Sequence, residues 1–276
     1  LLGSLVKSGE ELPDKRKGPN LKYTLNDAIK SAFGVFFFQF PSVLRYMTER
    51  ENKRKRNNAR SLLGVEQLPR DAQVRNLLDG IDPASLSPVF NETLQEAEER
   101  GVRADYRVVG CGVLLALDGV WYHASEQIQC EHCLHQDQAG VRTSSHRAVA
   151  GALVRPGCGS VVPGKGERIT NEDGPKKQDC ELTAAKRWVQ KHGEAYKWLK
   201  PTLLGDDLYA HYPFCKQIRE QGMSFICTYK ATTHPWLSET IENSYVTEIR
   251  ERTRVGKKRT VWTYRYLNGM TGRPCR

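Results

Sequence analysis

Apolar positions in the first hundred residues recur at the spacing of helix faces. From Leu25 to Phe40, apolar and aromatic side chains return every three or four positions, which predicts an amphipathic helix with a wide buried stripe. Thr24 suits the N-cap and Asp27 the third helical position, as in a capping box, and Pro41 ends the pattern. We expect the aromatic stripe to lie in the core. The remaining pattern predicts helices over 42–50, 71–78 and 83–100, after a loosely held polar lead-in over 1–23.

The pattern changes after Asp105, where short apolar runs are separated by Gly and Pro. Such runs predict buried strands, and strands followed by strand–helix alternation indicate a mixed α/β fold. We therefore expect a domain boundary near residue 103, between a helical region (1–103) and a strand-rich domain (104–276). Strands are predicted over 108–109, 113–117, 148–154, 160–162, 202–204, 223–229 and 260–268, and helices over 179–192 and 212–221.

Two of these predicted strands run directly into aspartate. Val113 to Leu117 is an unbroken apolar run followed by Asp118, and Thr202 to Gly205 is followed by Asp206 and Asp207. Carboxylates at neighbouring strand ends can bridge divalent cations, because Mg²⁺ prefers hard oxygen ligands. The pair therefore predicts a two-metal nuclease site. The alternative is that Asp118 begins an ordinary turn and Asp206 is a helix N-cap.

The chain is basic, since 42 Lys and Arg residues against 32 Asp and Glu give a formal net charge of +10. Such an excess favours a polyanionic partner, with nucleic acid before a membrane surface. No apolar run approaches the roughly 20 residues of a membrane span. A basic run at 49–60 would contact phosphate or form a solvated surface, and a predicted basic hairpin at 250–259 would follow DNA by phosphate contacts. Contact with the DNA backbone or surface solubility explains four further basic residues equally well: Lys176, Lys177, Lys186 and Arg187.

Cys130 and Cys133 form a C-x-x-C knuckle with the spacing of zinc ligands. With two more ligands, His146 and Cys180 before the others, they would hold a structural Zn²⁺. The alternative is free thiols in a loop or hairpin, because no second C-x-x-C completes the usual spacing. The eight cysteines are spread over a chain too long to need disulfides, which indicates a reducing compartment. The other candidate zinc ligands are His132, His135 and Cys158.

The chain resembles bacterial insertion-sequence transposases of the DDE type, whose catalytic core is RNase H-like. Three stretches carry the resemblance: LLALDGVWYHASEQIQCEHC (114–133), DGPKKQDCELTAAKRWV (173–189) and LLGDDLYAHYPFC (203–215). TLNDAIKSAFGVFF and NNARSLLGVEQLPRDAQVRNLLD are similar to that family's leading helical region. The resemblance covers most of the chain.

The resemblance implies a site, a cofactor and partners. Asp118 matches the first acid and Asp206 the second, with Tyr209 at the family's aromatic position and Asp207 as the alternative second acid. It also implies that the two aspartates bind Mg²⁺ or Mn²⁺. The expected partners are double-stranded DNA (element ends and target) and a second copy of the chain, as a homodimer in the synaptic complex. The expected location is the bacterial cytoplasm, associated with the nucleoid and without a membrane partner. Residues 1–103 would then bind DNA and residues 104–276 would be a catalytic domain that lacks its C-terminal part.

The family's third acid, a glutamate on a helix after the second aspartate, has no clear match. Glu239 and Glu242 are available, but they are better explained as the polar face of a short helix. Asp179 and Glu181 could orient the site, but we expect them to face solvent. Because the tail after Asn268 does not continue as in the family, we expect a truncated copy. The alternatives are therefore a metal-dependent transposase, a non-catalytic DNA-binding remnant, or another RNase H-like nuclease that uses Glu239 or Glu242.

Overall fold

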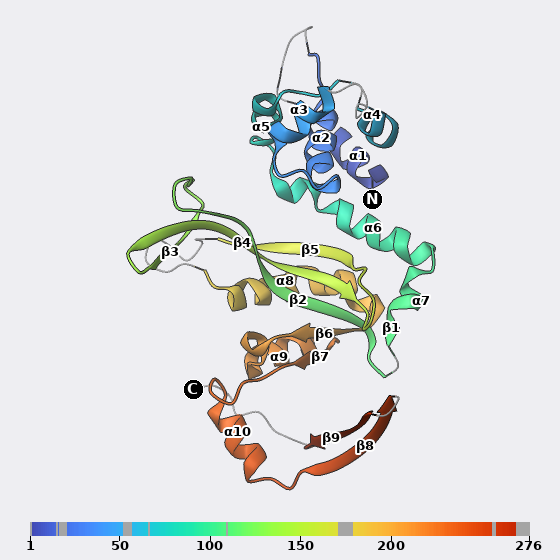
Figure 1. Ribbon diagram of the computed structural model, residues 1–276, viewed down its shortest axis with the longest axis vertical. Coiled ribbons are helices and arrows are strands. Elements are labelled where there is room, and N and C mark those ends of the chain that lie inside the picture. Colours follow the sequence, from blue (N-terminus) through green and yellow to red (C-terminus); the bar gives the residue numbers. More distant parts are fainter. Residues whose placement is uncertain are drawn as a thin grey trace. The chain divides into compact units, whose positions relative to one another are not determined.

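The computed structural model describes residues 2–14, 16, 21–51, 57–65, 67–108, 110–170, 179–255 and 258–268. It divides into two compact units, Leu1–Arg103 and Ala104–Arg276, and each is described by itself (Figure 1). Three sequence predictions concern residues outside the described ones: the centre of the basic run 49–60, the pair Lys176 and Lys177, and the tail after Asn268.

The first unit is a set of short helices around a small apolar core in which Leu5, Ile29 and Val89 are buried. The capping box predicted at Thr24 is confirmed. Its Oγ1 accepts a hydrogen bond from the backbone N of Asp27 at 3.0 Å, and Oδ2 of Asp27 accepts one from the N of Thr24 at 2.9 Å. The elements are α1 (Leu2–Glu10), α2 (Leu25–Phe37), α3 (Val43–Glu51), α4 (Asn57–Leu63), α5 (Asp71–Leu78), the 3₁₀ helix η1 (Pro83–Leu86), α6 (Pro88–Glu99) and α7 (Val102–Tyr106), which crosses into the second unit.

Two predictions about this unit are wrong. The lead-in contains helix α1 because Leu5 contributes to the core. The aromatic stripe does not lie wholly in the core, since Phe36 is 82% and Phe37 56% exposed. Small residues decide which face of α2 is buried, because they let neighbours approach closely: a Cβ on Gly34 would lie 2.4 Å from Oη of Tyr46. The buried residues of α2 are Leu25, Ala28, Ile29, Ser31, Gly34 and Val35.

The second unit is built on a mixed sheet of seven strands among the described residues, so the predicted mixed α/β fold is confirmed. β2 (Gly112–Ser125) is central: β4 (Val141–Val154) pairs with it antiparallel, and β6 (Pro201–Gly205) pairs with it parallel. Antiparallel strands on one side continue into two parallel strands that follow helices, an arrangement compatible with the RNase H-like core that was expected. The other strands are β1 (Arg107–Val108) on β2, β3 (Leu134–Gln138) and β5 (Val162–Ile169) on β4, and β7 (Ser224–Cys227) on β6.

Helix α8 (Glu181–Tyr196) packs on the sheet through Trp188. This side chain is fully buried, and its Nε1 donates a hydrogen bond to the carbonyl of Lys165 at 2.7 Å. A Cβ on Gly151 of β4 would lie 2.8 Å from the indole, so the glycine is what lets the ring lie against the strand. The remaining helical elements are η2 (Lys197–Leu199), η3 (Asp207–Tyr209), α9 (Tyr212–Glu220) and α10 (Pro235–Glu242). Every described helix is too short or too polar to span a bilayer.

The strand that carries Asp118 is longer than predicted. β2 continues through Asp118 to Ser125, paired with β4 throughout, so the alternative that Asp118 begins a turn is wrong. The outer half of β2 is largely exposed, and its apolar residues Val120, Trp121 and Tyr122 are consecutive and do not alternate with polar ones, so the sequence shows no strand pattern there. β3 was not predicted either. It joins β4 through Ala139 and Gly140, whose φ values of 50° and 80° are those of a tight hairpin turn.

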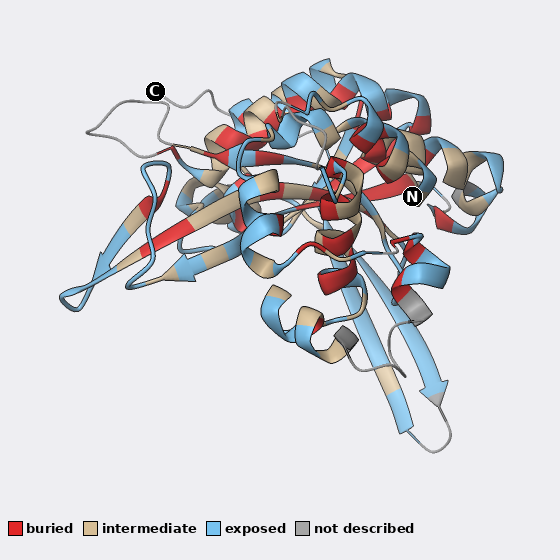
Figure 2. Cartoon of the chain, turned by 90° about the horizontal axis from the view of Figure 1, so that it is seen from above, coloured by how far each residue is buried: buried red, intermediate tan, exposed pale blue. Residues whose placement is uncertain are grey.

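The basic hairpin predicted at 250–259 is confirmed as part of a separate two-stranded sheet. β8 (Thr247–Val255) pairs antiparallel with β9 (Lys258–Tyr266), and we call this pair the ribbon. Its described residues are almost all exposed, as the pale strands of Figure 2 show.

Candidate functional site

Asp118 of β2 and Asp206, directly after β6, lie at the same level on neighbouring parallel strands. β2 and β6 are paired up to Ala116 and Leu204. Each aspartate follows two residues after this last pair, so the same register brings the two together. Both side chains are exposed. Two carboxylates that are far apart in the sequence are therefore neighbours at the edge where β6 ends.

Each of these carboxylates has one oxygen held by the backbone. Oδ1 of Asp118 accepts a hydrogen bond from the N of Gly119 at 2.8 Å, and Oδ1 of Asp206 accepts one from the N of Leu208 at 2.9 Å. Asp206 is thus an N-cap, of the 3₁₀ helix η3. No described residue donates a hydrogen bond to Oδ2 of either aspartate. Each side chain therefore retains an oxygen for a ligand.

Asp207, the alternative second acid, is engaged elsewhere. It is buried, and it accepts hydrogen bonds from Oγ1 of Thr233 at 2.6 Å and from the backbone N of Lys230. Nε2 of His234 lies 3.3 Å from its Oδ1. The hydrogen bond from Thr233 lowers the pKa of Asp207. These contacts tie Asp207 to the segment between β7 and α10, which favours Asp206 as the acid that faces a ligand.

A third carboxylate, that of Glu181 at the start of α8, lies next to Asp118. Its Oε1 accepts a hydrogen bond from Oη of Tyr209 at 2.7 Å. A Cβ on Gly119 would lie 2.1 Å from Oε2 of Glu181, so this carboxylate lies against the backbone of β2 next to Asp118. Burial, the bond to Glu181 and the charges of Asp118 and Asp206 raise the pKa of Tyr209, which keeps its hydroxyl protonated. The prediction that Glu181 faces solvent is wrong.

Sequence reasoning found Tyr209 only through the family pattern and set Glu181 aside. An acidic residue in the first turn suits any helix, because it faces the positive end of the helix dipole. The local pattern therefore could not distinguish Glu181 from an ordinary surface charge. Its place beside Asp118 depends on how α8 packs on the sheet through Trp188.

Asp179 does not face solvent either, but its contacts serve the fold. Its side chain is 1% exposed, and Nη2 of Arg187 lies 2.6 Å from its Oδ2. Nε of Arg187 is 3.1 Å from Oε1 of Glu167, and Nζ of Lys191 is 2.8 Å from the same oxygen. The hydrogen bond with Asp179 raises the pKa of Arg187. Arg187, for which contact with the DNA backbone and surface solubility were equal explanations, is engaged in an ion-pair network within the domain.

The two other candidates for a third acid lack the contacts that place Glu181. Glu239 and Glu242 are both exposed on α10. Among the described residues, it is Glu181 that is hydrogen-bonded to Tyr209 and lies against Gly119. Glu181 is thus better placed than either of them.

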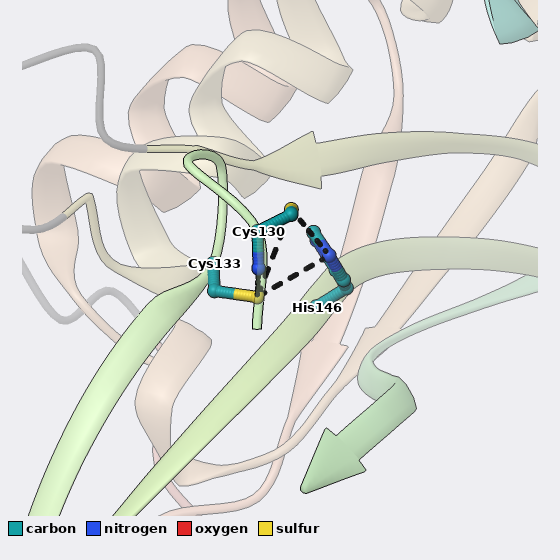
Figure 3. A group of neighbouring side chains, drawn as sticks. All are labelled: Cys130, Cys133 and His146. Carbon is teal, nitrogen blue, oxygen red and sulfur yellow. Dashed lines mark hydrogen bonds between the residues drawn. The ribbon is translucent and has the colours of Figure 1, made fainter. Parts of the chain in front are cut away.

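The C-x-x-C cysteines lie together with His146 (Figure 3). Their sulfur atoms are 3.8 Å apart, and Nε2 of His146 is 3.3 Å from Sγ of Cys130 and 3.5 Å from Sγ of Cys133. The cysteines belong to the connection between β2 and β3, and His146 belongs to β4. Among the described residues, this is the only group of at least three His, Cys, Asp or Glu side chains whose ligand atoms all lie within 4.8 Å of one another.

The other candidate zinc ligands lie outside this group. Cys180 is at the N-cap of α8, with its Sγ 3.2 Å from Oγ1 of Thr183. His135 lies on β3, where its Nδ1 is 3.2 Å from Oγ of Ser144. Cys158 lies in the connection between β4 and β5. The structure thus brings His146 to the cysteine pair and leaves Cys180 out.

Comparison with known proteins yields one weak similarity. No family model and no curated protein matches the chain. Among solved structures, the chain is similar to piggyBac transposase in a synaptic complex with hairpin DNA, with 14% sequence identity and a TM-score of 0.40 over 94% of this chain and 55% of that one. A TM-score of 0.40 is too low to support a shared function. The proposals below therefore rest on the residues of this chain.

Proposed function

We propose that this chain is a DDE transposase, which binds element DNA and cuts and joins its strands at Asp118 and Asp206 with Mg²⁺ or Mn²⁺. The proposal rests on one observation: these two exposed carboxylates lie at the same level along neighbouring strands of an RNase H-like sheet. Each retains an oxygen that no described residue binds. Mg²⁺ prefers hard oxygen donors and is commonly held by one or two carboxylates together with water and substrate phosphates, so this donor set fits it.

When bound, the metal would supply the charge that activates the attacking oxygen and stabilises the leaving one. The part of the protein is to hold its own groups in position. Asp118 lies within the paired length of β2, and the backbone bond from Leu208 orients Asp206. Carboxylates held in place in this way would position the metal and the phosphate without a further rearrangement.

We assign the third acid to Glu181 in place of Glu239 or Glu242. Its carboxylate lies against Gly119, one residue from Asp118. The protonated Tyr209 donates to one of its oxygens, which fixes the direction of the other. Glu181 would therefore reach the reacting phosphate or its metal from the side of α8.

The ribbon supports DNA as the partner. Side chains alternate between the two faces of a strand, so the register of β8 and β9 assigns each residue to a face. A two-stranded ribbon fits the major groove of DNA, and arginine side chains bind phosphate without reading sequence. One face of the ribbon, the basic face, carries Arg250, Arg252, Arg254, Arg259, Arg265 and Glu248. The aromatic residues Trp262, Tyr264 and Tyr266 lie on the opposite face.

The proposal extends to the helical unit as a second DNA-binding region, and to a homodimer that joins two element ends with target DNA. The small apolar core of that unit, around Leu5, Ile29 and Val89, supports an independently folded binding region. Binding of a labelled duplex by the full chain, with its stoichiometry measured by light scattering, tests both points.

The central test is nicking of supercoiled plasmid with Mg²⁺ or Mn²⁺. We expect wild type to nick and Asp118→Asn to lose about 100-fold or more of the rate. The matched control is Asp137→Asn, an exposed aspartate that pairs with Arg142 on the β3–β4 hairpin. If no protein nicks but all bind DNA with an affinity that falls as salt rises, the chain is the non-catalytic DNA-binding remnant.

A further inference from the structure

The proposed strand cleavage makes no use of Cys130, Cys133 and His146, yet their separations are those of ligands around one ion. When a tetrahedral ion binds two sulfurs at about 2.3 Å and one nitrogen at about 2.1 Å, the sulfurs are about 3.8 Å apart and each is about 3.6 Å from the nitrogen. The observed separations are 3.8 Å between the sulfurs, and 3.3 and 3.5 Å from sulfur to nitrogen. All three distances thus agree with a single shared ion.

The types of the donor atoms select the metal. Thiolate sulfur and imidazole nitrogen are ligands for Zn²⁺, whereas Mg²⁺ and Ca²⁺ take oxygen. Two backbone hydrogen bonds form a turn that orients the sulfurs. The N–H of Cys130 donates to Sγ of Cys133 at 3.3 Å, and the N–H of Cys133 donates to the carbonyl of Cys130 at 3.2 Å. This turn points both sulfurs toward Nε2 of His146, as Figure 3 shows.

The segment that carries the cysteines is held by few other contacts: the N–H groups of Gln127 and Ile128 donate to Oγ of Ser125, and Oγ of Ser144 donates to Oε1 of Gln129. Residues 126–132 are all exposed, and Ile128, a large apolar side chain in this segment, is 68% exposed. Cys133 is the first buried residue after them. A connection without apolar burial is stabilised chiefly by cross-links, and a structural zinc ion is one of these.

We propose that Cys130, Cys133 and His146 bind one Zn²⁺, which fastens the connection between β2 and β3 to β4. The ion would join the connection that precedes β3 to β4, the strand that pairs with β3. Cys130 is exposed, so a fourth ligand can reach the ion from that side. The role is structural, and it does not depend on the proposed transposase activity.

Zinc content is the first test. We expect about one zinc per chain in the full-length wild type purified under reducing conditions without chelator. Cys158→Ser, which removes a half-buried thiol outside the group, should retain it. Cys130→Ser and His146→Ala should each lose most of it. Wild type without zinc, or equal zinc in all four proteins, would overturn the proposal.

A second test uses the wild type alone, because a ligand variant could fail to fold. Glu126 and Glu131 lie in the exposed connection and are sites for a glutamate-specific protease. We expect chelation to speed cleavage at these two sites, and added Zn²⁺, but not Mg²⁺, to slow it again. Unchanged cleavage with and without Zn²⁺, or a Cys130–Cys133 disulfide in the reduced preparation by mass spectrometry, would show that the pair does not bind zinc.

Discussion

The hydroxyl of Tyr209 donates a hydrogen bond of 2.7 Å to Oε1 of Glu181, although the two residues are 28 positions apart. Tyr209 is fully buried, and Glu181 is half-buried. The phenol therefore sets the direction of a carboxylate that lies beside Asp118. It also ties the segment after β6 to the first turn of α8, so the two elements that bound the candidate site are bonded to each other.

Removing this hydroxyl should destabilise the domain. In Tyr209→Phe, the carboxylate of Glu181 loses its donor while remaining half-buried. We expect a loss of about 1–3 kcal/mol in the free energy of unfolding, measured by urea denaturation. Tyr245→Phe is the control, because that side chain is 100% exposed. If Tyr209→Phe unfolds at the same urea concentration as wild type, the bond makes no net contribution.

A methyl group at Gly119 should disturb the site more than the fold. The Cβ of Gly119→Ala would lie 2.1 Å from Oε2 of Glu181, so the carboxylate must move. We expect plasmid nicking to fall about 100-fold, the scale of an ångström-sized misplacement of a reacting group. Gly159→Ala is the control, since a Cβ there meets nothing within 4 Å. Full nicking activity in Gly119→Ala would mean that the position of Glu181 does not matter to the reaction.

The ion pairs of Glu167 should make stability depend on acid pH. Burial raises the pKa of Glu167, but hydrogen bonds from Lys191 and Arg187 outweigh it and leave the pKa lowered. The folded pKa is thus below the unfolded value of about 4.3, so the contribution is full above that pH and is lost as the pH falls through the folded pKa. We expect Glu167→Gln to cost about 1–3 kcal/mol at pH 7.

Urea denaturation at pH 7 and near pH 3 measures this effect. The difference between wild type and Glu167→Gln should shrink at the lower pH, because the carboxylate is then protonated in the unfolded chain and must lose that proton to form its ion pairs. Glu194→Gln, whose side chain is 75% exposed, should behave like wild type at both values. An equal difference at both pH values would assign the loss to packing and not to charge.

The arginine face of the ribbon should set the salt dependence of DNA binding. Replacing both Arg252 and Arg259 with glutamine should weaken DNA binding. It should also reduce the magnitude of the slope of log affinity against log salt concentration by about 2. Arg100 and Arg142, exposed and paired with acids elsewhere, provide a double glutamine control with the same change in net charge. If both double variants change the slope equally, the effect comes from overall charge and not from the ribbon.

Features that depend on neighbours in the sequence could be predicted. The capping box at Thr24 and Asp27 involves atoms three residues apart, so spacing alone identifies it. The helix around Trp188 follows from apolar positions on a single face. Both aspartates were also found, because an apolar run followed directly by a carboxylate leaves a local signal.

Features that depend on pairing could not be predicted. The outer half of β2 has no apolar alternation, so only its ladder with β4 keeps it extended past Asp118. The choice of His146 over Cys180 follows from register, since His146 lies opposite His123 of β2, near the cysteine turn. Glu181 reaches the site only because α8 packs across the sheet. In each case the partner is distant in sequence, and no local pattern indicates it.

The register between β2 and β6 also orders events during synthesis. β2, β3 and β4 are joined by short connections and can assemble early, whereas β6 must close a loop that contains β3, β4, β5 and α8. Closing long loops is slower than forming hairpins. Asp118 therefore stays without Asp206 until β6 has left the ribosome and docked. A nascent chain that ends before β6 would therefore hold a single acid, and the pair of carboxylates forms only after β6 docks on β2.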